Sequence, residues 1–327
     1  MINIYLKPNH DKIVDVKESK LKNIDKNSLL WVDVFSPTER ERALIREIID
    51  VNLLTREEAQ EIESTSKYNE TKEGVVANLN FIEPQDSGFK SEPLSFVLAN
   101  NGTLVSVRHI ECDIFAETAR RIELDKSGNT TGADIFMTLV EAHIDREADM
   151  MEMLALRISE LSHQISGSNS IGKNIIKLIS SLQEHIIMFR ENVFDLQRVL
   201  FSIQRSTRFD SNIKPRLEMI LKDVDSLINH ADFSFQRLDS LQDTAMGLIN
   251  IEQNEIVKIL SIAAVLFMPP TLVASMYGMN FKYMPELNWT WQLEGGTLIP
   301  LGYIFALCLM IIFALLTLWF CKLKKWL

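Results

Sequence analysis

Small and hydroxyl-bearing residues recur at steps of three and four along residues 254–275. This stripe consists of Asn254, Val257, Ser261, Ala264, Met268, Thr271 and Ser275, with Leu260 beside it. The oxygens of Asn, Ser and Thr are neutral hydrogen-bond acceptors, and such groups can hold the water molecules that surround a cation. The opposite side carries larger apolar residues such as Ile262, Leu266 and Phe267, which are typical of lipid contact. Such a stripe is typical of helix–helix packing or of a water-lined path, and by itself it does not decide between them.

Two C-terminal segments are long and apolar enough to cross a membrane. Residues 259–277 and 297–321 carry no formal charge. The apolar core of a bilayer is about 30 Å thick and needs roughly 20 helical residues. Two buried core helices are the alternative, but uncharged runs of this length are rare in soluble proteins. We therefore expect two membrane-spanning helices, the first of which carries the stripe.

The absence of charged ligands in these spans restricts the chemistry of a path along the stripe. Neither span contains Asp, Glu, Arg or His. Mg²⁺ gives up its water reluctantly and can be held through its hydration shell by neutral oxygens. A transition metal would be expected to need His, Cys or carboxylate ligands. One helix cannot enclose a path, so a pore requires an oligomer with this face turned inward. The Pro269-Pro270 pair should bend the helix and free backbone carbonyls.

Charge predicts the orientation of the chain. The loop at 278–296 holds one Lys and two Glu, whereas three Lys follow the second span, which places the C-terminus in the cytoplasm. Two spans return the N-terminus to the same side. The net charge is −10, and four Lys and two Glu after residue 258 contribute +2, so residues 1–258 carry −12. An acidic cytoplasmic part disfavours nucleic acid as a partner and suits a cation.

The chain is predicted to have an α+β organisation in three parts. Residues 1–130 alternate strand-like and helical stretches, with a turn at Asn101-Gly102, and form a cytoplasmic α/β domain. Residues 131–258 have long helical patterns, the last of which begins near Pro215 and continues as a stalk into the first span. Residues 259–327 hold the two spans, the outer loop at 278–296 and a basic tail. The three cysteines and six histidines show no metal-ligand spacing, and we interpret them as structural.

Several C-terminal motifs resemble one transporter family. YGMN at 277–280 is followed by FKYMPEL, and the chain ends in KKWL. AMGLINIEQNEIVKI at 245–259 and FMPPTLVASMYGMN at 267–280 extend the match. Together these motifs resemble the proteobacterial branch of the CorA family of magnesium and cobalt transporters. The position of Gly-Met-Asn at the end of the first of two C-terminal spans makes the resemblance specific.

The resemblance implies a homopentameric channel in the inner membrane, lined by five first spans. Gly278, Met279 and Asn280 would form the outer mouth, where a ring of Asn280 amides holds a hydrated ion, while Met279 and Tyr283 pack around the turn. The family's pore positions fall on Asn254, Val257, Leu260, Ala264, Met268 and Thr271, to which the stripe adds Ser275. Val257, Leu260 and Met268 would be a hydrophobic gate. A basic collar near the inner mouth would consist of Lys322, Lys324 and Lys325.

The resemblance also implies passive influx of Mg²⁺ driven by the membrane potential, with Co²⁺ and Ni²⁺ as further substrates. Intracellular Mg²⁺ would close the channel by bridging acidic groups of neighbouring subunits. Glu61, Asp223 and Asp225 are the candidates for this regulatory site. One carboxylate of the family's pair is missing, because Gln60 stands in its place.

Other classes of function stay open at this point. A two-span sensor is one, although its outer loop would be short for a ligand domain. A membrane-anchored enzyme is another, but P-loop, GxSxG and HExxH motifs are absent from the sequence, so we expect neither catalysis nor an organic cofactor. Within the channel class, a zinc or nickel transporter of the same superfamily is the alternative.

Overall fold

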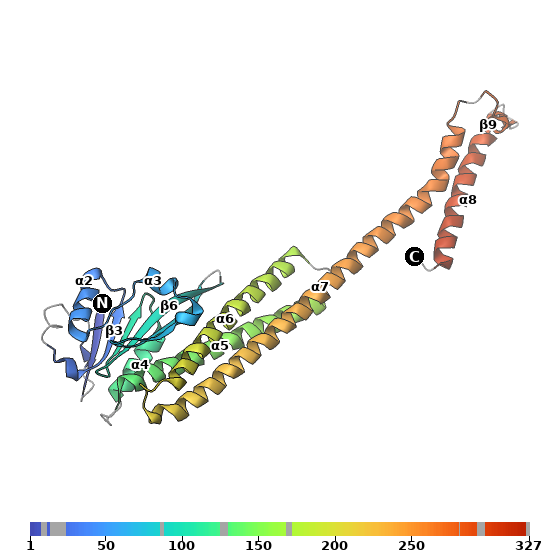
Figure 1. Ribbon diagram of the computed structural model, residues 1–327. Coiled ribbons are helices and arrows are strands. Elements are labelled where there is room, and N and C mark those ends of the chain that lie inside the picture. The colour runs from blue at the N-terminus through green and yellow to red at the C-terminus, as the bar shows by residue number, and fades with distance from the viewer. Residues whose placement is uncertain are drawn as a thin grey trace. The chain divides into compact units, whose positions relative to one another are not determined.

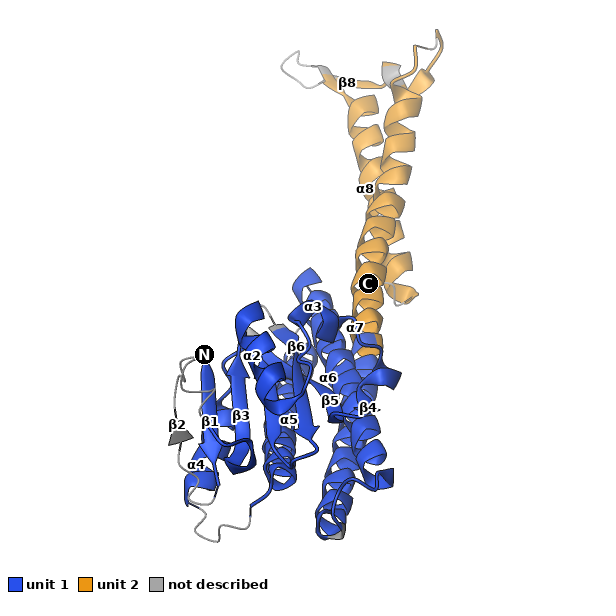
Figure 2. Ribbon diagram, turned by 60° about the vertical axis from the view of Figure 1, so that its left-hand side comes forward, with its two compact units in different colours: residues 1–168, 172–242 blue, residues 169–171, 243–327 orange. Residues whose placement is uncertain are grey.

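The computed structural model describes residues 1–7, 12–13, 24–85, 88–124, 130–167, 172–280, 282–292 and 298–324. The chain divides into two units, of which one comprises Met1–Ser168 and Gly172–Gln242 and the other comprises Asp243–Leu327 (Figure 2). Helix α7 (Lys214–Tyr277) begins in the first unit and ends in the second. Each unit is described by itself below.

A seven-stranded mixed sheet forms the centre of the first unit. Its strands are β1 (Ile2–Leu6), β2 (Lys12–Ile13), β3 (Leu29–Phe35), β4 (Tyr68–Glu70), β5 (Gly74–Gln85), β6 (Gly88–Ala99) and β7 (Leu104–Arg108). Their order in the sheet is β2-β1-β3-β7-β6-β5-β4. The pair β3–β7 is parallel, with Trp31 opposite Leu104, and the other pairs are antiparallel. The expected turn at Asn101-Gly102 joins β6 to β7, where Gly102 has a φ of 79°.

Helices cover both faces of this sheet. The shorter helices of this unit are α2 (Glu39–Ile49), α3 (Arg56–Gln60), α4 (Asp113–Leu124), and the 3-10 helices η1 (Lys26–Ser28), η2 (Ser64–Ser66) and η3 (Ser211–Ile213). Helix α2 starts with a capping box between Thr38 and Glu41, and its buried Leu44, Ile45 and Ile48 pack on one face of the sheet. The other face buries aromatic side chains, among them Phe96, whose ring is 5.4 Å from that of Phe136 on α5 (Gly132–Gly167).

Three long helices extend this unit: α5, α6 (Lys173–Arg205) and the first part of α7 (Figure 1). On the first part of α7, the apolar side chains of Leu217, Val224 and Leu238 are buried. Helix α7 is continuous across Pro269 and Pro270, although neither proline can donate a backbone hydrogen bond, so one helix runs from the stalk into the first apolar segment. The expected α+β architecture with a continuous stalk is confirmed.

The second unit contains two long apolar helices. The C-terminal part of α7 and α8 (Leu301–Leu323) run antiparallel beside each other in both views (Figures 1 and 2). Both are long and apolar enough to cross a membrane, and little of either apolar segment is buried within the chain. Between them lie η4 (Pro285–Asn288) and a small hairpin of β8 (Thr290–Gln292) and β9 (Leu298–Pro300). The sequence analysis did not expect this hairpin in the outer loop.

Candidate ion path and regulatory residues

The two sides of the membrane part of α7 differ sharply in exposure. The less exposed residues form one stripe that comprises Ile262, Ala263, Leu266, Pro269, Pro270, Val273 and Tyr277. Helix α8 runs beside this part of α7 and covers that side. The side expected to contact lipid is therefore largely a helix–helix contact, because two adjacent apolar helices pack on each other before they meet lipid. Phe267 and Ile259 remain exposed.

The stripe of small and hydroxyl residues lies on the opposite side of α7. Ala264 and Val273 are nine residues apart, which is about two and a half helical turns, so they point in opposite directions. All eight residues of the predicted stripe, from Asn254 to Ser275 and with Leu260 and Ser261 counted, are exposed. The side chains of Leu260 and Met268 are 71% and 67% exposed. Among the described residues of the chain, no other element covers this face.

Two hydroxyl groups on this face are oriented as acceptors. The Ser261 Oγ donates to the Val257 carbonyl at 2.8 Å, and the Thr271 Oγ1 donates to the Phe267 carbonyl at 2.7 Å. The hydroxyl hydrogens are thus used inside the helix, and the oxygen lone pairs remain available outward. Water bound to a cation points its hydrogens away from the ion. These hydroxyls therefore suit a hydrated cation better than a bare anion.

The Gly-Met-Asn turn follows directly on the end of α7. The Gly278 N–H donates to the Ala274 carbonyl at 2.9 Å, and a Cβ on Gly278 would lie 3.0 Å from that oxygen. Gly278 does not have a left-handed backbone, so the close approach of this carbonyl, rather than φ, favours glycine. Asn280 is exposed, Met279 is half exposed and Tyr283 is 89% exposed. Phe281, which was expected to pack around the turn with Tyr283 and Met284, lies outside the described residues.

The three regulatory candidates occupy exposed positions on two elements. Glu61 is the C-cap of α3, and Asp223 and Asp225 lie on α7. Asp225 accepts a hydrogen bond from Gln197 at 2.5 Å. Among the described residues, no group of three or more His, Cys, Asp and Glu side chains is arranged to hold a metal ion.

The basic collar is described at two of its three positions. Lys322 and Lys324 are exposed at the C-terminal end of α8, and Lys325 lies outside the described residues. A helix C-terminus carries partial negative charge, so lysines there are favourable. The position is compatible with the collar and with a simple topology signal.

A buried polar cluster in the first unit was missed by the sequence analysis. His143 and Glu147 on α5 and Asn192 on α6 are each at least 95% buried. The Asn192 Nδ2 donates to the Glu147 Oε1 at 3.0 Å, and the His143 ring stacks on Phe81 at 3.8 Å. Burial raises the pKa of Glu147 to about 8 and, aided by Arg146, lowers the pKa of His143 to about 3. The signal in the sequence was the spacing of four between His143 and Glu147, which places them on one helix face.

This cluster predicts a specific pH dependence of stability. In the folded protein the pKa of Glu147 is raised from 4.5 to about 8. The contribution of the neutral Glu147 side chain to the free energy of unfolding is therefore fully present below pH 4.5 and is lost as the pH rises through 8. Within that window the loss approaches about 1.4 kcal/mol per pH unit. Glu147→Gln keeps a neutral side chain at every pH, so the melting temperature of the variant should rise relative to wild type between pH 5 and pH 9. Thermal unfolding of the full-length protein measures this difference, and exposed Glu152→Gln is the control. A difference between Glu147→Gln and wild type that is constant over the pH range would contradict the prediction.

An α/β unit with three long helices, followed by two long apolar helices of which one keeps a polar stripe exposed, is the combination expected of a membrane transport protein. The family model described as CorA-like Mg²⁺ transporter protein matches residues 26–325, and the chain belongs to this family. A magnesium transport protein CorA of Wolinella succinogenes is 32% identical over 306 residues, covering 92% of each chain. A magnesium transport protein CorA of Helicobacter pylori strain 26695 is 30% identical over 332 residues and covers all of both chains.

The fold is also that of a solved structure. The CorA magnesium transporter from Methanocaldococcus jannaschii matches with a TM-score of 0.80 at 16% identity, covering 100% of this chain and 98% of that one. At this identity the likeness establishes the fold alone. The resemblance noted from the C-terminal motifs is thus confirmed over nearly the whole length of the chain.

Proposed function

We propose that the chain assembles into a homopentameric channel that admits Mg²⁺ passively along the membrane potential. The observation that carries the proposal is the exposed stripe of α7, which faces away from α8 and contains neutral oxygens but no charged group. The names of the relatives support Mg²⁺ as the substrate. Five such stripes turned inward would enclose a path that a hydrated Mg²⁺ can follow without losing its shell. Co²⁺ and Ni²⁺, whose hydrated ions have a similar size and charge, are proposed as further substrates.

The proposed path has three functional parts. Gly278, Met279 and Asn280 form the outer mouth, where the exposed Asn280 amide accepts hydrogen bonds from the ion's water. Val257, Leu260 and Met268 form an apolar constriction that closes when it loses water. The lysines at the end of α8 surround the inner mouth, and both termini lie in the cytoplasm of a cell whose inner membrane holds the channel.

Closure by intracellular Mg²⁺ is proposed to occur between neighbouring cytoplasmic units. Glu61 of one copy and Asp223 or Asp225 of the next would share the ion. The exposure of all three carboxylates and the lack of a complete site within one chain, over the described residues, support an arrangement between subunits. Carboxylates and water are the ligands that Mg²⁺ prefers.

Uptake into proteoliposomes tests the driving force. With an inside-negative potential, vesicles that contain the full-length protein should accumulate Mg²⁺ without any nucleotide. The potential supplies about 2.3 kcal/mol per charge per 100 mV, which is enough to concentrate a divalent ion strongly. A fluorescent Mg²⁺ indicator inside the vesicles measures the uptake.

The same assay separates the alternatives. Competition by external Co²⁺, Ni²⁺ and Zn²⁺ ranks the substrates, and protein-free vesicles give the leak. Uptake that occurs only with ATP, or Zn²⁺ uptake that exceeds Mg²⁺ uptake, would contradict the proposal.

A further inference from the structure

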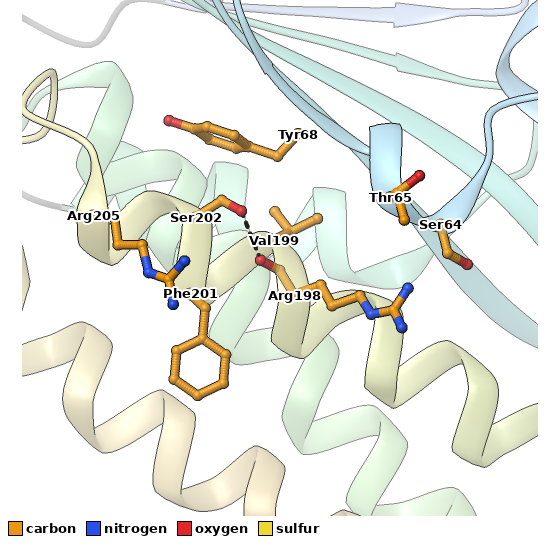
Figure 3. A pocket seen from close by; sticks show the side chains of 8 residues that line it. All are labelled: Ser64, Thr65, Tyr68, Arg198, Val199, Phe201, Ser202 and Arg205. Carbon is orange, nitrogen blue, oxygen red and sulfur yellow. Dashed lines mark hydrogen bonds between the residues drawn. The ribbon is translucent and has the colours of Figure 1, made fainter.

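A cavity of about 400 Å³ lies in the first unit between α6 and the segment from η2 to β4 (Figure 3). Its lining consists of Ser64, Thr65, Tyr68, Arg198, Val199, Phe201, Ser202 and Arg205. The two segments are more than 100 residues apart in the sequence, so the tertiary structure creates this pocket. Neither segment belongs to the proposed ion path.

The pocket has an excess of positive charge in an otherwise acidic unit. Arg198 and Arg205 both line it, and no carboxylate does. Neither guanidinium forms an ion pair with another residue that the structure describes. On these segments, Asp195 is paired with Lys67 at 2.6 Å and Glu70 with Arg208 at 3.5 Å. The positive charge of the pocket is therefore available to a ligand.

The arrangement of the lining residues matches a phosphate-bearing ligand. Arg198 and Arg205 lie seven residues apart on α6, with Ser202 between them, and their side chains extend on either side of it (Figure 3). The Ser202 hydroxyl donates to the Arg198 carbonyl at 2.9 Å, so Ser64 and Thr65 are the hydroxyls left to donate to a ligand. Guanidinium groups bind phosphate oxygens in a bidentate manner, and hydroxyl donors complement them.

Aromatic groups give the pocket an apolar component as well. The Phe201 side chain is 41% exposed, and half-buried Tyr68 lines the opposite segment. An exposed phenylalanine beside two arginines has no packing partner that explains it, but its ring can contact a planar base. A volume of about 400 Å³ falls in the range of small-molecule sites.

We propose that this pocket binds a nucleoside phosphate, with the phosphates on Arg198 and Arg205 and the base against Phe201. The site would make the cytoplasmic unit responsive to a phosphorylated metabolite, by a route separate from the carboxylates proposed to sense Mg²⁺. The proposed event is binding, with no chemical change of the ligand. The proposal stands independently of the transport activity.

Calorimetric titration of the full-length protein in detergent tests the site directly. ATP, ADP and tripolyphosphate are titrated in the presence of EDTA, so that binding does not depend on Mg²⁺. ATP and ADP should bind saturably, and Arg198→Ala and Arg205→Ala should each weaken binding at least tenfold. Phe201→Ala should weaken ATP but leave tripolyphosphate unchanged.

Arg120→Ala is the matched control, because Arg120 is an exposed arginine on α4 without an ion pair among the described residues. It should bind ATP like wild type. Because Arg198, Arg205 and Phe201 are exposed, the variants should melt at the wild-type temperature. Absence of saturable ATP binding, or unchanged affinity in the double arginine variant, would overturn the proposal. ATP affinity that Phe201→Ala leaves unchanged, or tripolyphosphate that binds as tightly as ATP, would overturn the assignment of a nucleoside.

Discussion

Asn280→Ala should abolish Mg²⁺ uptake while leaving the oligomer intact. The Asn280 amide is exposed directly after α7, where its oxygen can accept a hydrogen bond from the water shell of an arriving ion. Each such hydrogen bond contributes about 1 kcal/mol, and the substitution removes it from every subunit of the ring at once. No buried group depends on this side chain, so folding should be unaffected.

Asn280→Asp should also fail or lose selectivity, for a different reason. A ring of carboxylates would repel one another, which raises the pKa of some of them, and those that stay ionised would bind cations too tightly to release them. The Asn280→Ala variant would bind the cation too weakly and the Asn280→Asp variant too tightly. This pair of results is specific to a position that contacts the ion. A merely structural asparagine would not produce it.

Growth of a strain that lacks its own magnesium transport, at limiting Mg²⁺, measures both variants. Size-exclusion chromatography with light scattering checks the oligomer. Asn288→Ala is the matched control, because Asn288 is exposed in the same loop but lies in η4, away from the end of α7. Wild-type growth by a correctly assembled Asn280→Ala variant would remove Asn280 from the pore mouth.

Leu260→Asn or Met268→Asn should leave the channel open at high internal Mg²⁺. Both side chains are apolar and strongly exposed on the free face of α7, at 71% and 67%. An apolar constriction stops ions by excluding water, and an amide in the ring would keep it wet. Efflux and influx at high internal Mg²⁺ should therefore rise several-fold over wild type, as measured in vesicles loaded with Mg²⁺.

Ile259→Asn provides the control for the gate. Ile259 is adjacent in sequence and 68% exposed, but it points to a different side of the helix. The same polar group there should not raise the leak, even though it carries a similar cost in an apolar environment. If flux at high Mg²⁺ is unchanged in Leu260→Asn and Met268→Asn, or rises equally in Ile259→Asn, the constriction lies elsewhere.

Much of the architecture followed from local patterns. Uncharged runs at 259–277 and 297–321 predicted the two apolar helices, and the absence of proline between Pro215 and Pro269 predicted one continuous helix leading into the first. The strand Leu29–Phe35 has a local cause as well, because LLWVDVF is apolar at every position except Asp33, which suits a central strand. Such features depend on residues that are close together in the chain, so the local sequence is sufficient to predict them.

Shorter elements with weaker patterns were not predicted. Helix α4, Asp113–Leu124, and strand β4, Tyr68–Glu70, exist because the sheet offers them a surface on which to pack or pair. Their own propensities are modest, and tertiary contacts decide such cases. The hairpin of β8 and β9 in the outer loop has the same explanation.

The sequence by itself determined which residues share a face of α7, because helical periodicity fixes the stripe from Asn254 to Ser275. It did not determine which side of α7 meets α8: of the residues expected to contact lipid, Ile262 and Leu266 are partly covered, whereas Phe267 is exposed. Only the tertiary structure brought Glu147 to Asn192, 45 residues apart, and Tyr68 to Arg205 around one pocket. The physical reason is that periodicity reports the direction of a side chain, whereas burial, pairing and pKa depend on what the rest of the chain places opposite it.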